Sequence, residues 1–314
     1  MIGDLFSTQN CFVNSPRIFI VDGTGNGDDK KYKEDMQFGF CRQIEAENSN
    51  TSLYLRGPDA ASLNAYSVSA NANRILSIIE ESTKRSGKSG ICLIGYSRGG
   101  ATVVKIAQEI QSRGLQGKVE VDAMFLFDAV QRAPGAGDQT EVPSNVKVCF
   151  HAMRNDGAYW ILKAEVENAW ALVTKSSEYA ELVKEYKRVG SGFFETFLLS
   201  RSKTKYPALN TAVTGYLKKN TVLDRYEMTM RNSWTVVKNE KGETEPGLPF
   251  GNCATGGSML KTEQFAGSHA ALGGCVWRTL GPEIAKLDEE CKSRVKTWMW
   301  PNLMRHGISV GARK

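Results

Sequence analysis

The segment LIGYSRGG at positions 93–100 limits what this chain can fold into more than any other feature. Four of the five residues in ICLIG are apolar, which is typical of a buried central strand in a parallel sheet. The segment that follows, ATVVKIAQEIQSRG, has apolar residues at helical spacing and ends at Gly114. Gly95 and Gly99 flank Ser97 and remove side chains where a strand and a helix crowd together. The sequence therefore predicts a strand, a sharp turn at Ser97 and a helix.

Apolar strands alternate with helical patterns along much of the chain, which predicts an α/β fold with a mostly parallel sheet and helices on both faces. From 157 to 249 the pattern changes to amphipathic helix and then to mixed polar sequence, and we interpret this stretch as an insertion, or cap, packed over the site. We expect a single domain over residues 1–314 that carries this mainly helical insertion. The expected strands are 17–23, 91–95, 121–130, 145–156 and 259–269, and the expected helices outside the insertion are 71–85, 101–114 and 276–300.

Charge and cysteine content bear on partners and cofactors. Forty Lys and Arg against 34 Asp and Glu give a net charge of +6, a mild excess that suits anionic surfaces but lacks the dense basic stripe of nucleic-acid-binding proteins. Seven scattered cysteines without C-x-x-C or metal-ligand spacing predict reduced thiols, synthesis in the cytosol and no metal. MIGDLFSTQN has neither a basic start nor an apolar core, and no stretch approaches ~18 apolar residues, so we expect neither a secretory signal nor a membrane span.

Ser97 has the local sequence of a catalytic nucleophile. G-x-S-x-G between a strand and a helix is similar to the nucleophile elbow of α/β-hydrolases, and a serine hydroxyl needs a base and an orienting acid. His269, in AGSHAALGG, lies just past the last expected strand, where α/β-hydrolases deliver their base, and small residues flank it. We expect His151 to line the site or to be hydrogen-bonded in the core, and His306, near the basic tail, to be solvated.

Two aspartates compete for the role of the acid, and the residues alone leave the choice open. Asp128 ends a strongly buried strand, at the carboxyl edge where catalytic groups of open α/β sheets gather. Shielding from water strengthens the effect of a carboxylate on an imidazolium. Asp156 follows the next strand in a polar loop, and the usual strand order of α/β-hydrolases favours it.

The glycine-rich turn DGTGNGDDK at 22–30 departs from three known phosphate or nucleotide patterns. The third glycine of a dinucleotide fingerprint is absent, the Gly-Lys-Ser/Thr of a Walker loop is absent, and Ile20 stands where haloacid dehalogenases have their nucleophile. Two interpretations stay open. The segment is either a simple tight turn or half of an oxyanion hole, with N–H donors from Arg98 and from Gly23 or Thr24.

Five sequence blocks occur in one order: DGTGN, GYSRGG, FDAV, HAMRND and GSHAALGG. Together they resemble the uncharacterised α/β-hydrolase domain family that includes the catalytic domains of type VI secretion phospholipase effectors. The resemblance covers about 18–274, and only the blocks are specific. It implies that Ser97 is the nucleophile, Asp128 the acid and His269 the base.

Three positions depart from the family pattern, although the triad positions are intact. Gly157 replaces the glutamate that follows the aspartate of the H-A block, Ala271 replaces the aspartate two residues past the histidine, and Ala129 replaces the threonine of F-D-T-V.

The resemblance implies hydrolysis of an acyl ester, in particular of a phospholipid, in an antibacterial or membrane-damaging role. It implies an acyl-enzyme without a cofactor, and export through a contact-dependent secretion system. TKYPALNTAVTGYLKKN at 204–220 is expected either to meet an anionic bilayer transiently or to be half-buried in its own protein. Two alternatives stay open: a hydrolase of small soluble esters or amides with the insertion as a pocket cap, and a non-catalytic binding module of the same fold. The sequence does not fix the oligomeric state.

Overall fold

Six strands form one all-parallel sheet in the order β2-β1-β3-β4-β5-β8. The computed structural model describes residues 16–25, 28–58, 67–86, 89–130, 138–155, 157–189, 192–226, 237–238, 244–245, 253–254, 256–257, 259–275 and 282–311. The strands are β1 (Ile18–Val21), β2 (Ser52–Leu55), β3 (Ser89–Tyr96), β4 (Val119–Phe127), β5 (Cys149–Asn155) and β8 (Leu260–Ala266). The central strands β1, β3 and β4 are apolar and buried, which suits a sheet covered on both faces, whereas the edge strand β8 is mostly polar and exposed.

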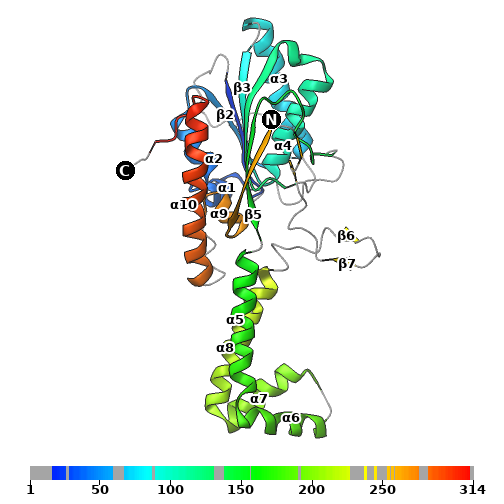
Figure 1. Ribbon diagram of the computed structural model, residues 1–314, viewed down its shortest axis with the longest axis vertical. Helices are drawn as coiled ribbons and strands as arrows, with labels where there is room; N and C mark the ends of the chain where they lie inside the picture. The colour runs from blue at the N-terminus through cyan, green and yellow to red at the C-terminus, as the bar shows by residue number, and fades with distance from the viewer. Residues whose placement is uncertain are drawn as a thin grey trace.

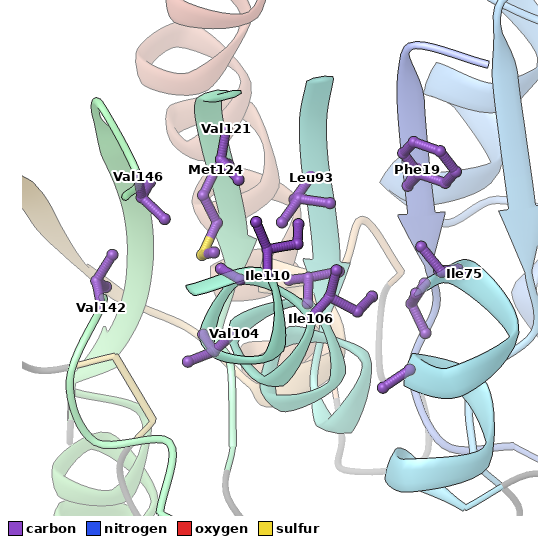
Figure 2. Packing of buried hydrophobic residues seen from close by; sticks show 14 of the residues in the cluster. Phe19, Ile75, Leu93, Val104, Ile106, Ile110, Val121, Met124, Val142 and Val146 are labelled. Atoms are coloured by element: carbon purple, nitrogen blue, oxygen red, sulfur yellow. The ribbon is translucent and has the colours of Figure 1, made fainter. Parts of the chain in front are cut away.

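Helices cover both faces of the sheet (Figure 1). Residues along a strand point alternately to the two sides, so the apolar strands present a hydrophobic surface on each face for helices to cover. From β1, Phe19 and Val21 pack on the side of α3 (Val68–Ser86) and α4 (Arg98–Ser112). Ile18 and Ile20 pack on the side of α2 (Phe40–Glu47) and α10 (Pro282–Arg305). Figure 2 shows the first of these cores, in which Leu93 of β3 faces Ile106 and Ile110 of α4. Each fully buried side chain of this kind contributes ~1.5–3 kcal/mol to folding.

The order of the strands places a topological switch point beside β1. The chain leaves β1 for β2 on one side and then returns to β3 on the other side, so the connections diverge between β1 and β3. In open α/β sheets, ligands bind at the carboxyl ends of the strands at this kind of switch point. The glycine turn follows β1 and Ser97 follows β3, so both lie at this edge.

The insertion is a helical arm. It consists of α5 (Gly157–Thr174), α6 (Ser177–Val189), α7 (Phe194–Lys205) and α8 (Pro207–Tyr226). Figure 1 shows α5 and α8 side by side, extending away from the carboxyl edge of the sheet, with α6 and α7 at the far end. At the base of the arm, Tyr159, Leu162 and Tyr226 pack with Ile284 of α10. These contacts do not test whether the insertion covers the site, so its role as a cap stays a prediction.

The predicted α/β fold with a parallel sheet, two helical layers and a helical insertion is confirmed. The elements that the sequence did not predict are short: α1 (Asp29–Met36), α2, β2, the 3-10 turn η1 (Leu115–Gly117), α9 (His269–Leu272), and the pair β6 (Val237–Lys238) and β7 (Thr244–Glu245). The N-terminal segment MIGDLFSTQN and the first residues of the predicted closing helix lie outside the described residues. The cysteines in the described part of the chain carry free thiols. None of the helices described is both long and apolar enough to span a bilayer.

Candidate active site

Ser97 lies on a strained turn between β3 and α4. Its φ of 55° and ψ of −129° are unusual for a residue with a side chain, and such a conformation costs of order 1–3 kcal/mol. The two motif glycines make the turn sterically feasible. A Cβ on Gly95 would lie 2.6 Å from Gly100 Cα, and one on Gly99 would lie 2.2 Å from the carbonyl oxygen of Val21. The predicted strand, sharp turn and helix are present.

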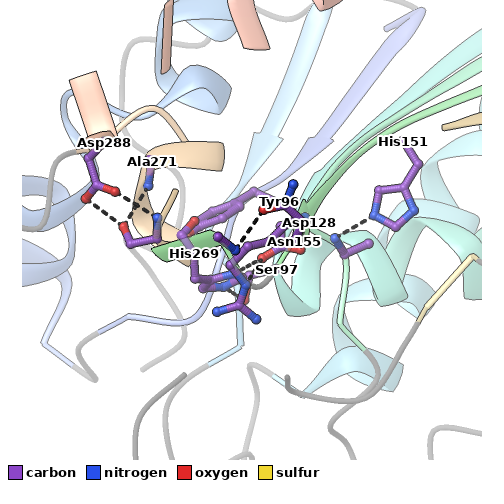
Figure 3. Close-up of polar contacts among 12 residues, drawn as sticks. Tyr96, Ser97, Asp128, His151, Asn155, His269, Ala271 and Asp288 are labelled. Carbon is purple, nitrogen blue, oxygen red and sulfur yellow. Dashed lines mark hydrogen bonds and ion pairs between the residues drawn. The ribbon is translucent and has the colours of Figure 1, made fainter. Parts of the chain in front are cut away.

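Ser97, His269 and Asp128 form one continuous chain of hydrogen bonds (Figure 3). Ser97 Oγ lies 2.8 Å from His269 Nε2, and His269 Nδ1 lies 2.6 Å from Asp128 Oδ2. Ser97 comes from the end of β3, Asp128 follows β4, and His269 opens α9 after β8. The three side chains are mostly buried, so water screens their interactions little. The structure therefore brings together the three residues that the sequence singled out for nucleophile, acid and base.

Asp128 is held as a carboxylate. Burial by itself would raise the pKa of Asp128, but the positive charge of Arg154 and the hydrogen bond from His269 lower that pKa to about 2. The backbone N–H of Arg154 donates to Oδ1 at 3.1 Å, and the Arg154 Nε lies 3.6 Å from Oδ2. Asp128 is therefore ionised at neutral pH and accepts a hydrogen bond from the Nδ1–H of His269. The competing aspartate, Asp156, lies outside the described residues.

His151 supports the turn that carries Asp128. Its Nε2 accepts the backbone N–H of Ala129 at 3.0 Å, and its Nδ1 lies 3.2 Å from the carbonyl oxygen of Ala254, so Nδ1 carries the proton. Burial lowers the pKa of His151, which keeps the ring neutral. His151 is thus a hydrogen-bonded core residue, as one of the two expectations had it. His306 differs from expectation: it packs edge-on against Phe125 and Phe150 instead of being solvated, because α10 runs along that face of the sheet.

The glycine turn lies directly beside Ser97. A Cβ on Gly23 would lie 3.2 Å from Ser97 Cβ, and Arg98 Nε donates to Thr24 Oγ1 at 2.5 Å. The N–H of Gly23, however, donates to Asp22 Oδ1 at 2.8 Å. Of the two predicted donors in the turn, Gly23 has therefore directed its N–H to Asp22, and Thr24 stays the predicted oxyanion donor together with Arg98, the first residue of α4.

Asp22 is a site residue that the sequence analysis did not single out. It is buried and accepts hydrogen bonds from Gly23 N and from the Tyr54 hydroxyl, the latter at 2.7 Å. Burial raises the pKa of Asp22. Tyr32 closes the turn from the other side: its hydroxyl donates to the Gly23 carbonyl and accepts from Gly57 N, both at 2.8 Å. The D-G-T block at 22–24 was the available signal, but only the fold places Tyr32 and Tyr54 against it.

Asp288 was also missed, and it anchors the loop of His269. Asp288 is fully buried in α10, and its two oxygens accept from Ser268 N and Ser268 Oγ, each at 2.7 Å. Ser268 directly precedes His269 and caps α9 by accepting from Ala271 N at 3.3 Å (Figure 3). No local sequence pattern connects positions 268 and 288, so this contact was not predictable from the residues. Among the described residues, no group of three or more His, Cys, Asp or Glu is placed to hold a metal ion.

Comparisons with known proteins find only distant structural similarity. No protein-family model and no curated protein matches the chain. One similar solved structure is the Tle1 effector bound to the VgrG spike from the type 6 secretion system, with 15% identity, 45% of each chain covered and a TM-score of 0.25. The chain thus spans less than half the length of that effector. Another is the RedJ thioesterase from the prodiginine biosynthetic pathway in Streptomyces coelicolor, with 12% identity, 90% of this chain and 87% of that chain covered, and a TM-score of 0.28.

Proposed function

We propose that this protein is a serine hydrolase that cleaves acyl esters, with phospholipid esters as the preferred substrates. The observation that carries the proposal is the unbroken series of hydrogen bonds from Ser97 through His269 to Asp128 at the carboxyl edge of the sheet. These groups come from three separate segments of the chain, and a nucleophile, a base and an ionised acid in this order are the requirements of acyl transfer.

The first step forms an acyl-enzyme. Ser97 Oγ attacks the ester carbonyl carbon while its proton passes to His269 Nε2, and Asp128 stabilises the resulting imidazolium. The backbone N–H groups of Arg98 and Thr24 would stabilise the negative oxygen of the tetrahedral intermediate, each such donor being worth about 10²–10³ in rate. The carbon–oxygen bond to the leaving alcohol then breaks, and the imidazolium protonates that alcohol.

The second step releases the acid. Water enters, His269 Nε2 removes one of its protons, and the hydroxide attacks the acyl carbon bound to Ser97. Collapse of the second tetrahedral intermediate breaks the bond between the acyl carbon and Ser97 Oγ, and His269 returns its proton to Oγ. The enzyme is restored, and one ester bond has been hydrolysed with the consumption of one molecule of water.

The lipid preference rests on the family resemblance and on the far end of the arm. Within the segment 204–220, Leu209 and Val213 are buried inside the insertion, which favours the half-buried alternative for this segment. Phe193 and Val189, at the α6–α7 junction, are instead 86% and 48% exposed. Residues 175–205 contain seven Lys or Arg and four Glu. Exposed apolar side chains beside a basic excess favour transient contact with an anionic membrane surface.

Labelling with a fluorophosphonate probe tests the hydrolase proposal. The wild type should be labelled, and Ser97→Ala should abolish labelling while circular dichroism and the thermal melt stay unchanged. Labelling that persists in Ser97→Ala would remove Ser97 as the nucleophile. Absence of labelling and of turnover of p-nitrophenyl butyrate in the wild type would instead favour the non-catalytic binding module.

The substrate class needs a separate measurement. Hydrolysis of a short phosphatidylcholine should rise sharply above its aggregation threshold if the protein acts on lipid surfaces. Activity confined to monomeric esters or amides would favour the small-substrate hydrolase. Lipid analysis of membranes exposed to the wild type or to Ser97→Ala would identify the bond that is cleaved.

A further inference from the structure

Tyr96 contacts His269 in two ways, through its ring and through its hydroxyl. It ends β3 directly before Ser97, and its side chain is mostly buried. The Tyr96 ring stacks on the His269 imidazole, with ring centroids 5.0 Å apart and planes 28° from parallel. The Tyr96 hydroxyl donates to the backbone carbonyl of His269 at 3.1 Å. One side chain therefore contacts both the ring and the main chain of the base.

Two glycines hold the Tyr96 ring in this position. A Cβ on Gly23 would lie 2.5 Å from Tyr96 Cδ1, and a Cβ on Gly273 would lie 2.4 Å from Tyr96 Cζ. Tyr96 also pairs in register with Phe127, the residue before Asp128. The ring is thus packed between the glycine turn, the elbow and the base loop, with little room to rotate. Burial raises the pKa of Tyr96 well above its ordinary value, so the hydroxyl stays protonated as a donor.

We infer that Tyr96 is a positioning residue that aligns His269 with Ser97 and favours its imidazolium form. This inference rests on the proposed serine-hydrolase function. An aromatic face within about 6 Å attracts a cation, and the attraction is absent from the neutral ring, so stacking stabilises the charged state through which the base passes. The hydroxyl supplies a different effect, because it fixes the main chain from which the imidazole projects.

Other ionisable groups also act on His269, and the experiment must hold them constant. Asp128 bonds its Nδ1, Arg154 and His151 act on Asp128, and Asp288 binds the preceding Ser268. The groups with charge interactions on Tyr96 itself are Cys275, Asp128, Asp22 and Cys41. Variants at Tyr96 leave all of these residues in place.

The experiment compares Tyr96→Leu, Tyr96→Phe and the control Phe125→Leu. Phe125 is a buried aromatic in the same core as Tyr96. It pairs across the β3–β4 ladder with Ile94, two positions before Tyr96, and it contacts Phe150 and His306. The pH dependence of kcat/KM for p-nitrophenyl butyrate, measured from pH 5 to 9, reports the apparent pKa of the base in the free enzyme. The rate of fluorophosphonate labelling across the same range provides a second readout.

Tyr96→Leu should move the acid limb of kcat/KM to lower pH by about 0.5–1 unit, because the imidazolium loses its aromatic partner. Tyr96→Phe keeps the ring, so the limb should stay in place while kcat falls about fivefold from loss of one hydrogen bond. Phe125→Leu should lower the melting temperature without moving the acid limb of kcat/KM. If Tyr96→Leu does not fold by circular dichroism, Tyr96→Met, which also removes the ring, replaces it.

The outcomes separate this inference from the proposed function. An unlabelled, inactive wild type overturns the hydrolase proposal itself. An active wild type whose acid limb is the same in the folded ring-deletion variant overturns the role of Tyr96 while leaving the hydrolase intact. A shift of equal size in Phe125→Leu would mean that loss of any core aromatic has this effect, and would likewise overturn the inference.

Discussion

At the scale of single residues, the site depends on which groups carry charge. Asp128 is shielded from water yet ionised, because Arg154 and His269 lower its pKa to about 2 against the effect of burial. His151, on the neighbouring strand β5, is neutral because burial has the larger effect there and lowers its pKa. The two groups meet at the turn 128–129, one accepting from Arg154 N and the other from Ala129 N. A charged carboxylate, Asp128, and a neutral imidazole, His151, therefore lie next to each other on adjacent strands.

Asp128→Asn should lower kcat/KM for p-nitrophenyl butyrate by about 10³–10⁴-fold, because an amide in place of the carboxylate no longer stabilises the imidazolium or its correct tautomer. Steady-state kinetics measure the loss, and an unchanged thermal melt shows that the fold is retained. A variant with more than a tenth of wild-type activity would return the acid role to Asp156.

The neutral state of His151 predicts that stability decreases in mild acid. The pKa of His151 is lowered in the folded protein, so the unfolded chain binds more protons as pH falls below ~6.5, and the free energy of unfolding decreases there. Urea unfolding at pH 7.5, 6.0 and 5.0 measures this slope. His306, whose pKa burial also lowers, contributes in the same direction, so His306→Gln serves as the matched control.

His151→Gln should flatten the pH dependence by its own share, because the titrating ring is gone while Asp22 and the other acids are unchanged. An identical slope in His151→Gln and the wild type would show that protonation of His151 does not limit stability in this range.

At the scale of elements, the base is positioned by a helix distant in sequence. α9 has only four residues, too few to be stable alone, so its orientation depends on tertiary contacts. Asp288 of α10 supplies two of them through Ser268. The glycine turn depends in the same way on α1 and β2, from which Tyr32 donates to the Gly23 carbonyl and Tyr54 donates to Asp22. The catalytic loops are therefore held by the layers behind them.

Asp288→Asn should reduce kcat by about tenfold with little change in KM, because the amide nitrogen cannot accept from Ser268 and the base loop loses alignment. The buried unpaired donor should also lower the free energy of unfolding by about 1–3 kcal/mol. Kinetics and urea unfolding of Asp288→Asn, Ser268→Ala and the double variant form a cycle. Additive effects on kcat would contradict a shared role of the two residues.

At the scale of the whole molecule, the sequence predicted the features that depend on apolar periodicity and on the order of segments along the chain. The central strands 18–21, 89–96 and 119–127 are apolar enough to be recognised alone, and the order of Ser97, Asp128 and His269 follows their strand ends. β2 is a four-residue edge strand with three half-buried residues, and α1 is mostly charged, so neither has a strong pattern. Asp22, Tyr96 and Asp288 act through contacts that only the folded chain creates. The direction of the arm likewise depends on packing at Ile284, which no pattern within 157–249 contains.

The exposed end of the arm predicts that membrane activity and chemistry can be separated. Phe193→Glu adds a charge to an exposed apolar position at the start of α7, the helix at the far end of the arm, so turnover of p-nitrophenyl butyrate should be unchanged. Binding to phosphatidylglycerol vesicles and hydrolysis of their lipid should fall about tenfold or more, since both apolar insertion and attraction to anionic headgroups are weakened. Lys286→Glu, at an exposed position of α10, changes the side-chain charge by two units rather than one and should have the smaller effect. Equal vesicle binding by the wild type and Phe193→Glu in sedimentation would show that the membrane contact, if lipid is the substrate, lies elsewhere on the molecule.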